Sequence, residues 1–360
     1  MRSFLLLLLL ALIPAQTLFA QTSWKGTVST NWSTASNWTA GVPTSSIDAI
    51  IGDVNFTGSF HPTMTSGNTV FCRALTIGTG AVACTLSVGR NINCYGDVTI
   101  GSNGTILQNT NSRIITVKGN WTNNGNYAAT GTNTSVTFSG SAQIISGTTN
   151  FRSITINSGT TVTLGTNLAV STTLSISGTL DPTANHVVSG TSNLTVNSGG
   201  TLLVKAATFA GNYAITGIVS LNGRSTVNYA SSSINQNISA AYTYGYLRIS
   251  GGTTKFLTAN LPALSATSSN SGRVYVDAGT FDLQSFTANR GTTVSGGYFI
   301  VAIGATMKIG GSNEFPQNYS YVSVASNSTV NYCGTNQVIR DYNYGNLVFE
   351  SSAGVAIKTM

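Results

Sequence analysis

Acidic side chains are scarce in this sequence. The 360 residues include 9 Asp and Glu against 16 Lys and Arg, and charged residues make up 7% of the chain, against about 25% in typical globular proteins. Glycoside hydrolysis needs two carboxylates that face each other across one bond, and the candidate pair in the sequence is Asp277 and Asp282. We therefore expect a protein without catalytic activity and place a polysaccharide lyase or hydrolase last among the alternatives.

Basic side chains are more numerous, but they are not clustered. No two Lys or Arg residues are adjacent, and none occurs between Arg152 and Lys205. Nucleic-acid binding would require a basic stripe or patch on the surface. The formal charge of +7 reflects the shortage of acids, and we expect no nucleic-acid partner.

Cysteine is also scarce, and the four residues are Cys72, Cys84, Cys94 and Cys333. No C-x-x-C pair occurs, so nothing in the sequence supports a zinc or redox site, and we predict no metal and no cofactor. Cys72 and Cys94 begin two similar segments and would lie on neighbouring turns of a stacked fold. They are the candidate disulfide, and two free buried thiols are the alternative.

Long apolar runs are missing after the first residues of the chain. Arg2 precedes an apolar run over Phe4–Ile13, and Ala20-Gln21 is a plausible cleavage point. A positive start followed by a short apolar stretch is typical of a secretory signal and is too short for a comfortable membrane span. We predict a signal peptide at residues 1–20, no transmembrane segment, and a secreted, extracellular or cell-surface location.

Short strands with period two fill most of the remaining chain. Leu75-Thr76-Ile77 and Val98-Thr99-Ile100 alternate apolar and small polar residues, and Ser-Gly, Asn-Gly and Gly-Thr turns separate such segments. The two segments are 23 residues apart, which matches one turn of a parallel β-helix. We predict an all-β fold, a right-handed parallel β-helix or solenoid, in which each turn buries its apolar face against its neighbours.

Three of the four tryptophans, Trp24, Trp32 and Trp38, occur at the start of the mature chain. A solenoid needs a cap, because its first turn would otherwise expose an unpaired edge and an open apolar end. We predict a Trp-rich N-terminal cap over residues 21–60 and a β-solenoid over residues 61–360. A sugar-stacking patch of exposed tryptophans is the alternative.

The chain also repeats itself at long range. Ser225–Tyr229 returns as Ser328–Tyr332, and Ser135–Phe138 is a looser copy. The aromatic residues that end these segments are 91 and 103 residues apart, so each module contains several turns. The expected copies are residues 134–224, 225–327 and 328–360. The last copy is truncated, which indicates the N-terminal part of a longer protein.

Tyrosines are the best candidates for ligand contact. Tyr242, Tyr244 and Tyr246 alternate, which would place them on one face of a strand, and Tyr342 and Tyr344 repeat two of them. In register along a rod, they could stack against sugars or a partner. Core packing and cross-strand pairing are the favoured alternative.

Two segments resemble a repeat of very large exported surface proteins. They are Gly119–Gly125, followed by Val136-Thr137-Phe138, and Ile309–Tyr319, which runs on to Ser328–Gln337. The resemblance is to adhesin-like β-helix proteins of Gram-negative bacteria, typically cargo of the type IX secretion system. It implies an extracellular rod without catalytic residues, delivered by secretion machinery through a C-terminal sorting domain that this sequence lacks.

Together these features predict a secreted or cell-surface structural and adhesive stalk. Its expected partners are a surface polysaccharide or the surface of a host or neighbouring cell. The main alternative is a carbohydrate-binding surface module that uses its Tyr or Trp faces.

Overall fold

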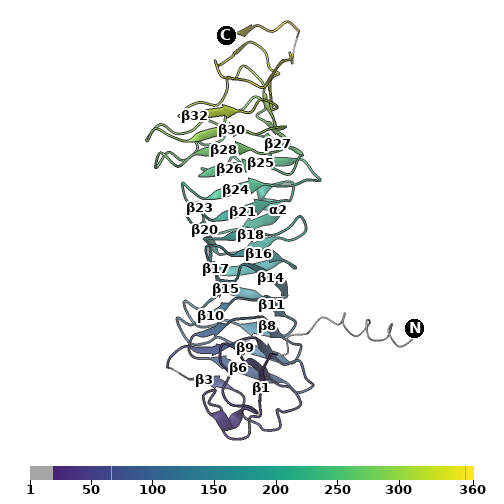
Figure 1. Ribbon diagram of the computed structural model, residues 1–360, viewed down its shortest axis with the longest axis vertical. Coiled ribbons are helices and arrows are strands. Elements are labelled where there is room, and N and C mark those ends of the chain that lie inside the picture. The colour runs from purple at the N-terminus through teal and green to yellow at the C-terminus, as the bar shows by residue number, and fades with distance from the viewer. Residues whose placement is uncertain (1–18, 66, 353) are drawn as a thin grey trace, which may run out of the picture.

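The computed structural model describes residues 19–65, 67–352 and 354–360, so the expected signal peptide lies almost entirely outside the described residues. The chain forms one elongated column of stacked strands, with the Trp-rich region at one end and the C-terminus at the other (Figure 1). The only helical segments among the described residues are a short 3-10 helix, η1 (Ala35–Asn37), and one α-helical turn, α2 (Phe209–Asn212). The predicted β-solenoid is confirmed.

The longest sheet, called the first sheet here, has 14 strands and runs almost the full length of the column. In spatial order it contains β1 (Gln21–Trp24), β2 (Asp48–Ile51), β5 (Leu75–Ile77), β8 (Val98–Ile100), β11 (Trp121–Asn123), β14 (Ala142–Gly147), β16 (Thr161–Leu164), β18 (Thr179–Asp181), β21 (Thr201–Val204), β24 (Thr226–Tyr229), β26 (Tyr246–Ile249), β28 (Arg273–Val276), β30 (Tyr298–Val301) and β32 (Tyr321–Val324).

Four further sheets form the other faces of the column. The second sheet contains β4 (Val70–Cys72), β7 (Ile92–Cys94), β10 (Ile114–Val117), β13 (Ser135–Phe138), β15 (Asn150–Ile156), β17 (Leu168–Ile176), β19 (Val188–Gly190), β20 (Asn193–Val196), β22 (Tyr213–Ile215) and β23 (Val219–Leu221). The third contains β3 (Thr63–Met64), β6 (Cys84–Val88), β9 (Gly104–Leu107) and β12 (Asn126–Ala128). The fourth contains β25 (Gln236–Ile238), β27 (Thr254–Leu257), β29 (Thr280–Asp282), β31 (Thr306–Ile309), β33 (Thr329–Tyr332) and β35 (Asn346–Phe349). The fifth pairs β34 (Gln337–Val338) with β36 (Lys358–Thr359).

Period two in the sequence produces one apolar interior. Leu75 pairs with Val98 and Ile77 with Ile100 in parallel register, as their 23-residue spacing predicts, and all four side chains are buried. Thr76 and Thr99 lie between them and point outward. Because the same alternation recurs on every floor, apolar side chains pack on those of the floors above and below and exclude water from a continuous core.

The tryptophans close the lower end of this core. Trp24, Trp32 and Trp38 are at most 2% exposed, and Trp38 packs edge-to-face on the other two at centroid distances of 5.0 and 4.8 Å. The Trp24 Nε1 donates to the Phe60 carbonyl at 2.7 Å. The predicted cap is confirmed. The alternative of a sugar-stacking tryptophan patch is wrong, because these rings have no free face.

The copies of the long repeat do not stack on the same side of the column. The strand that ends in the repeated aromatic residue is β13 with Phe138 in the second sheet, β24 with Tyr229 in the first, and β33 with Tyr332 in the fourth. The strand after β13 is β14, which lies in the first sheet, the same sheet that holds the aromatic strand of the second copy, β24. The strand after β24 is β25, which lies in the fourth sheet, the same sheet that holds the aromatic strand of the third copy, β33. Each copy is therefore displaced by one sheet around the column, and tyrosines of successive copies do not align along one face.

A buried glutamine marks the second strand of every copy. Gln143 in β14, Gln236 in β25 and Gln337 in β34 are at most 3% exposed. Each side chain accepts from a backbone N–H of the preceding turn residues and donates to two carbonyls of the floor below. The glutamine thus satisfies backbone groups at a corner where the strand ladder is interrupted.

Candidate binding face

The repeated Tyr-x-Tyr segments place one tyrosine of each copy against the core. Tyr244 is fully buried, and its hydroxyl lies 3.0 Å from that of Tyr229 and donates to the Ser239 carbonyl at 2.7 Å. Burial raises the pKa of Tyr229 to about 12, and burial also raises the pKa of Tyr244 well above its usual range. Tyr344 pairs in the same way with Tyr332, at 3.1 Å. The favoured interpretation, core packing and tyrosine pairing, describes these residues.

The other predicted tyrosines lie at the surface but do not form one row. Tyr242 packs on Phe209, with ring centroids 4.7 Å apart, and Tyr342 packs on Phe315 at 5.2 Å. Only Tyr246 belongs to a strand, as the first residue of β26. The expected alternation on one face is wrong, because residues 242–245 form a corner rather than a strand. Ligand contact through Tyr242, Tyr246 or Tyr342 stays a prediction.

A different set of tyrosines does form a row, on the outside of the first sheet. The outward residues of the last four strands of that sheet are aromatic or basic except for Ile300 and Ser323, whereas their neighbours in the chain point into the core and are buried in β26, β28 and β30. We call this surface the tyrosine–arginine face and define it as Tyr246 and Arg248 of β26, Arg273 and Tyr275 of β28, Tyr298 of β30 and Tyr321 of β32. Only Tyr246 was predicted from the sequence, because the others share no motif.

Arg273 lies at the centre of the tyrosine–arginine face. Its guanidinium carbon is 5.1 Å from the ring centroid of Tyr246 and 4.1 Å from that of Tyr298. Nη1 donates to the Tyr275 hydroxyl at 3.1 Å, and Nη2 donates to the Asn270 Oδ1 at 2.8 Å. These contacts hold the guanidinium in one orientation by cation–π attraction and by hydrogen bonds to neutral acceptors.

The two outward-pointing arginines of this face differ in whether they have an ion-pair partner. Arg248 forms an ion pair with Asp277, whereas Arg273 forms none among the described residues. A third arginine, Arg290, is 1% exposed and donates only to backbone carbonyls, including those of Ser268 and Ser271 in the same loop that carries Asn270. The region therefore holds two cations without a neighbouring carboxylate, one at the surface and one directly inside the loop.

A cleft continues the tyrosine–arginine face beyond β32. It has a volume of about 520 Å³ and is lined by Tyr321, residues 322–324, Asp341, Tyr342 and Asn343. The Tyr321 ring is 52% exposed and lies 5.4 Å from that of Tyr298. Aromatic ring faces and polar side chains are thus continuous from β26 to this cleft.

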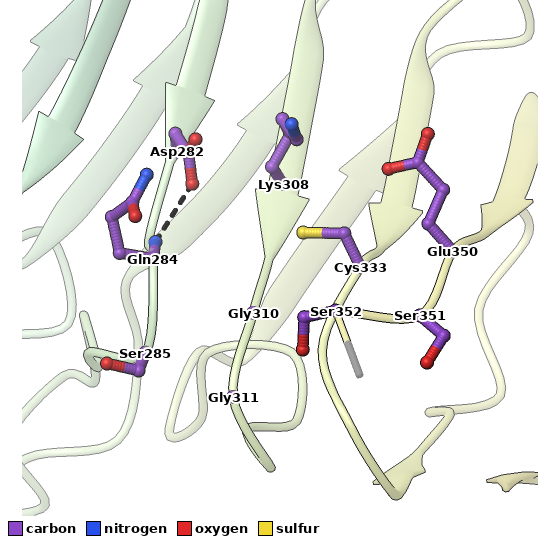
Figure 2. A pocket seen from close by; sticks show the side chains of 10 residues that line it. All are labelled: Asp282, Gln284, Ser285, Lys308, Gly310, Gly311, Cys333, Glu350, Ser351 and Ser352. Carbon is purple, nitrogen blue, oxygen red and sulfur yellow. Dashed lines mark hydrogen bonds between the residues drawn. The ribbon is translucent and has the colours of Figure 1, made fainter. Parts of the chain in front are cut away.

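A second hollow lies on the outside of the fourth sheet. The hollow has a volume of about 760 Å³. Figure 2 shows the side chains that line it, on neighbouring strands. Asp282 of β29 is next to Lys308 of β31 in register, and Glu350 follows β35. The complete lining is Asp282, Gln284, Ser285, Lys308, Gly310, Gly311, Cys333, Glu350, Ser351 and Ser352.

The spacing of acids in this hollow decides what it can do. Three steps of the sheet separate β29 from β35, or about 14 Å at about 4.8 Å per step, whereas hydrolysis of a glycoside requires carboxyl groups no more than about 9.5 Å apart. Figure 2 shows Lys308 and Cys333 between the two acids. Burial raises the pKa of the Cys333 thiol, which lowers the fraction of reactive thiolate. Asp277, the acid that the sequence paired with Asp282, is not in this hollow. It directly follows β28 of the first sheet and forms an ion pair with Arg248.

The predicted cysteine pair is adjacent but not bonded. Cys72 and Cys94 are register partners on β4 and β7, both are buried, and their sulfurs are 3.5 Å apart as free thiols. Hydrogen bonding between the two thiols and burial raise the pKa of Cys72 well above its usual range. In the part of the chain that the structure describes, no group of three or more His, Cys, Asp or Glu residues is placed to hold a metal, and no helix is long and apolar enough to cross a membrane.

Comparison with known proteins finds one family model. It is described as a domain of unknown function (DUF8693) and matches residues 23–164, which extend from the Trp-rich cap through β16. No curated protein and no solved structure matches the chain. The tyrosine–arginine face and the hollow of Figure 2 lie beyond the matched segment.

Proposed function

We propose that this chain is a structural and adhesive stalk that works outside the cell, either attached to the surface or released. The observation that carries the proposal is the uninterrupted first sheet, in which 14 strands from β1 to β32 share one core. Such a column holds its two ends at a fixed separation, because each floor is hydrogen-bonded to its neighbours. Export rests on the signal-like segment at residues 1–20.

The finer assignment, to adhesin-like surface proteins delivered by type IX secretion, is also part of the proposal. It is supported by the resemblance of Gly119–Gly125 and Ile309–Tyr319 to the repeat of those proteins. Detection of the chain in the culture medium or on the cell surface, and its loss after deletion of residues 1–20, tests the export step.

The stalk proposal is tested with beads that carry residues 21–360. Beads are washed over surfaces coated with different polysaccharides, and both retention of beads and release of soluble sugar are measured. A stalk retains beads and releases no sugar. Sugar release that disappears in Asp282→Asn and Glu350→Gln would instead assign a hydrolase or lyase to the hollow of Figure 2.

A second candidate function is carbohydrate binding, and the tyrosine–arginine face favours it. Four tyrosine rings on consecutive strands, two of which have one face against Arg273, offer apolar surface beside hydroxyl and amide groups, which suits the mixed surface of a sugar chain. Retention of the beads is expected to fall in a Tyr275→Ala, Tyr298→Ala double variant. Unchanged retention on every surface would place adhesion elsewhere on the column.

A further inference from the structure

We infer that the tyrosine–arginine face binds an acidic polysaccharide, with Arg273 contacting its carboxylate or sulfate groups. This inference rests on the proposed adhesive function and adds the chemical class of the ligand. It follows from three properties of the face: the spacing of its rings, the free donors of Arg273, and the local charge.

The rings are spaced for a polymer that lies along the column. They occur on the four consecutive strands β26, β28, β30 and β32 of a parallel sheet, which repeats about every 4.8 Å. A face of this kind spans about 14 Å in three steps, longer than a single sugar unit. The cleft beside Tyr321 extends it further in the same direction. A chain of linked sugars therefore fits the face better than a monosaccharide.

Arg273 retains donors for a ligand. A guanidinium has five N–H groups, and the structure uses one on Nη1 and one on Nη2, while Nε is buried without a partner. The two remaining terminal N–H groups are held in a fixed plane by the Tyr246 and Tyr298 rings. A pre-oriented fork of this type matches the geometry of a carboxylate or sulfate.

The local charge favours an anion over a neutral sugar. Arg273 and the buried Arg290 have no carboxylate partner among the described residues, and Asp277 is already paired with Arg248. Asp341 lines the cleft beyond β32, two strands away from Arg273 along the sheet, so the acidic groups of the ligand are expected at Arg273 and not in the cleft. Bringing an acidic group to Arg273 thus neutralises a cation without separating an existing ion pair. A neutral polymer would gain the ring contacts but not this attraction.

The same charges disfavour a nucleic acid. Single-stranded nucleic acids carry one phosphate per base and are bound in positively charged grooves that follow the backbone. The tyrosine–arginine face has four tyrosine rings but only one surface cation without an acidic partner, Arg273. An acidic polysaccharide does not depend on a positively charged groove alone, because the hydroxyl groups of its sugars also bind Tyr and Asn side chains.

The inference is tested by calorimetric titration of residues 21–360 with three probes: polygalacturonate, its methyl ester, and single-stranded DNA. The methyl ester has the same backbone without the charge. We expect polygalacturonate to bind at least about tenfold more tightly than the ester, and Arg273→Gln to remove roughly that factor without weakening binding of the ester. Tyr321→Ala, at an exposed position outside the core, is expected to weaken both polysaccharides.

Arg152→Gln is the matched control, since it removes one positive charge from β15 in the second sheet. It should bind all probes as the parent chain does. Equal affinity for polygalacturonate and its ester would overturn the acidic-ligand inference but leave the adhesive stalk intact. Binding of DNA that is as tight and as sensitive to Arg273→Gln would overturn it in favour of a nucleic acid. No binding by any probe, with beads still retained on polysaccharide surfaces, would exclude this face as the adhesive site.

Discussion

Lys255 is a basic side chain placed inside the column. It is fully buried in β27, and its Nζ donates to the Ser231 carbonyl at 2.7 Å and to the Thr253 Oγ1 at 2.6 Å, with no carboxylate partner. Burial without a countercharge lowers its pKa to about 8. The corresponding place, next to the glutamine, holds Val162 in the first copy of the repeat and Lys358 in the third. The lysine is therefore not required by the module itself.

Lys255 makes stability depend on pH in a defined direction. Because its pKa is lower in the folded chain than in the unfolded chain, where it is about 10.4, the unfolded chain binds more protons between these values. The free energy of unfolding therefore gains about 1.5 kcal/mol from this group between pH 8 and pH 9.5. We expect the stability of Lys255→Val relative to the parent chain to fall by that amount over this range, measured by urea unfolding. Other titrating groups, such as the buried thiols, are the same in both proteins and cancel in the comparison. If the free energies of unfolding of the two proteins changed in parallel between pH 8 and pH 9.5, the prediction would be wrong.

The cysteines provide a second prediction at this scale. Cys72, Cys84 and Cys94 are buried, whereas Cys333 is partly exposed in the hollow of Figure 2. We expect a maleimide reagent to label Cys333 slowly, and none of the three buried thiols, in the folded protein, and to label all four thiols in denaturant. Mass spectrometry counts the labels. Two labels in denaturant, with Cys72 and Cys94 unmodified until a reductant is added, would instead establish the disulfide that the sequence suggested as a candidate.

At the scale of single elements, side-chain amides replace strand hydrogen bonds at the corners. Asparagine Oδ1 atoms accept the backbone N–H of a residue on the next floor at nine corners: Asn91, Asn111, Asn120, Asn167, Asn193, Asn235, Asn260, Asn289 and Asn336. A corner that bends away from the strand ladder leaves such N–H groups without a backbone partner. The high Asn content thus has a structural cause in the stacking of turns.

Gln236 illustrates the strength of these corner contacts. Its Oε1 accepts from the Ser231 N–H at 3.0 Å, and its Nε2 donates to the carbonyls of Val204 and Ala206 at 2.9 and 2.7 Å. Gln236→Leu would leave these groups buried and unpaired, so we expect it to lower the free energy of unfolding by about 3 kcal/mol or more. Gln317→Leu, at an exposed position, should change it by no more than about 0.5 kcal/mol. Similar values for both variants would contradict the assignment.

The stacking of strands could be predicted from the sequence, whereas the grouping of side chains across irregular corners could not. Period two and a constant turn length predict that Leu75 lies beside Val98 and that Cys72 lies beside Cys94 on neighbouring strands. Both pairs are register partners in the structure. Tyr275, Tyr298 and Tyr321 could not be grouped in advance, because their alignment depends on the irregular corners between strands. The role of the repeated glutamine was missed as well, although its position after the aromatic residue of each copy was a usable signal.

At the scale of the whole molecule, stability is a sum over neighbouring floors. The core runs through the entire column, but each floor contacts mainly the floors directly above and below it. Damage to one floor should therefore remain local. This behaviour distinguishes a solenoid from a globular domain, whose core unfolds as one unit.

Ile176→Ala tests this locality. Ile176 is fully buried in β17, and its truncation should cost about 2 to 4 kcal/mol where it leaves a cavity. Hydrogen exchange measured by mass spectrometry should quicken in β15, β17 and β20, and stay unchanged in β28 and β30. Thr173→Ala, at an exposed site in the same strand, is the control. Loss of protection spread evenly from β1 to β32 would show a single cooperative unit instead.

The displacement of successive repeats by one sheet has an effect on how such a molecule can diversify. A side chain that arises in one module and is copied with it points to a different side of the column in each copy. Successive copies of that side chain therefore follow a spiral around the column. A straight fibre resting against the shaft would meet the new side chain once, whereas a flexible polymer wound around it would meet every copy. Gene duplication in this architecture therefore places different residues along any one side of the column, and the tyrosine–arginine face, whose four strands all belong to the copy at residues 225–327, is not produced by repetition of the long module.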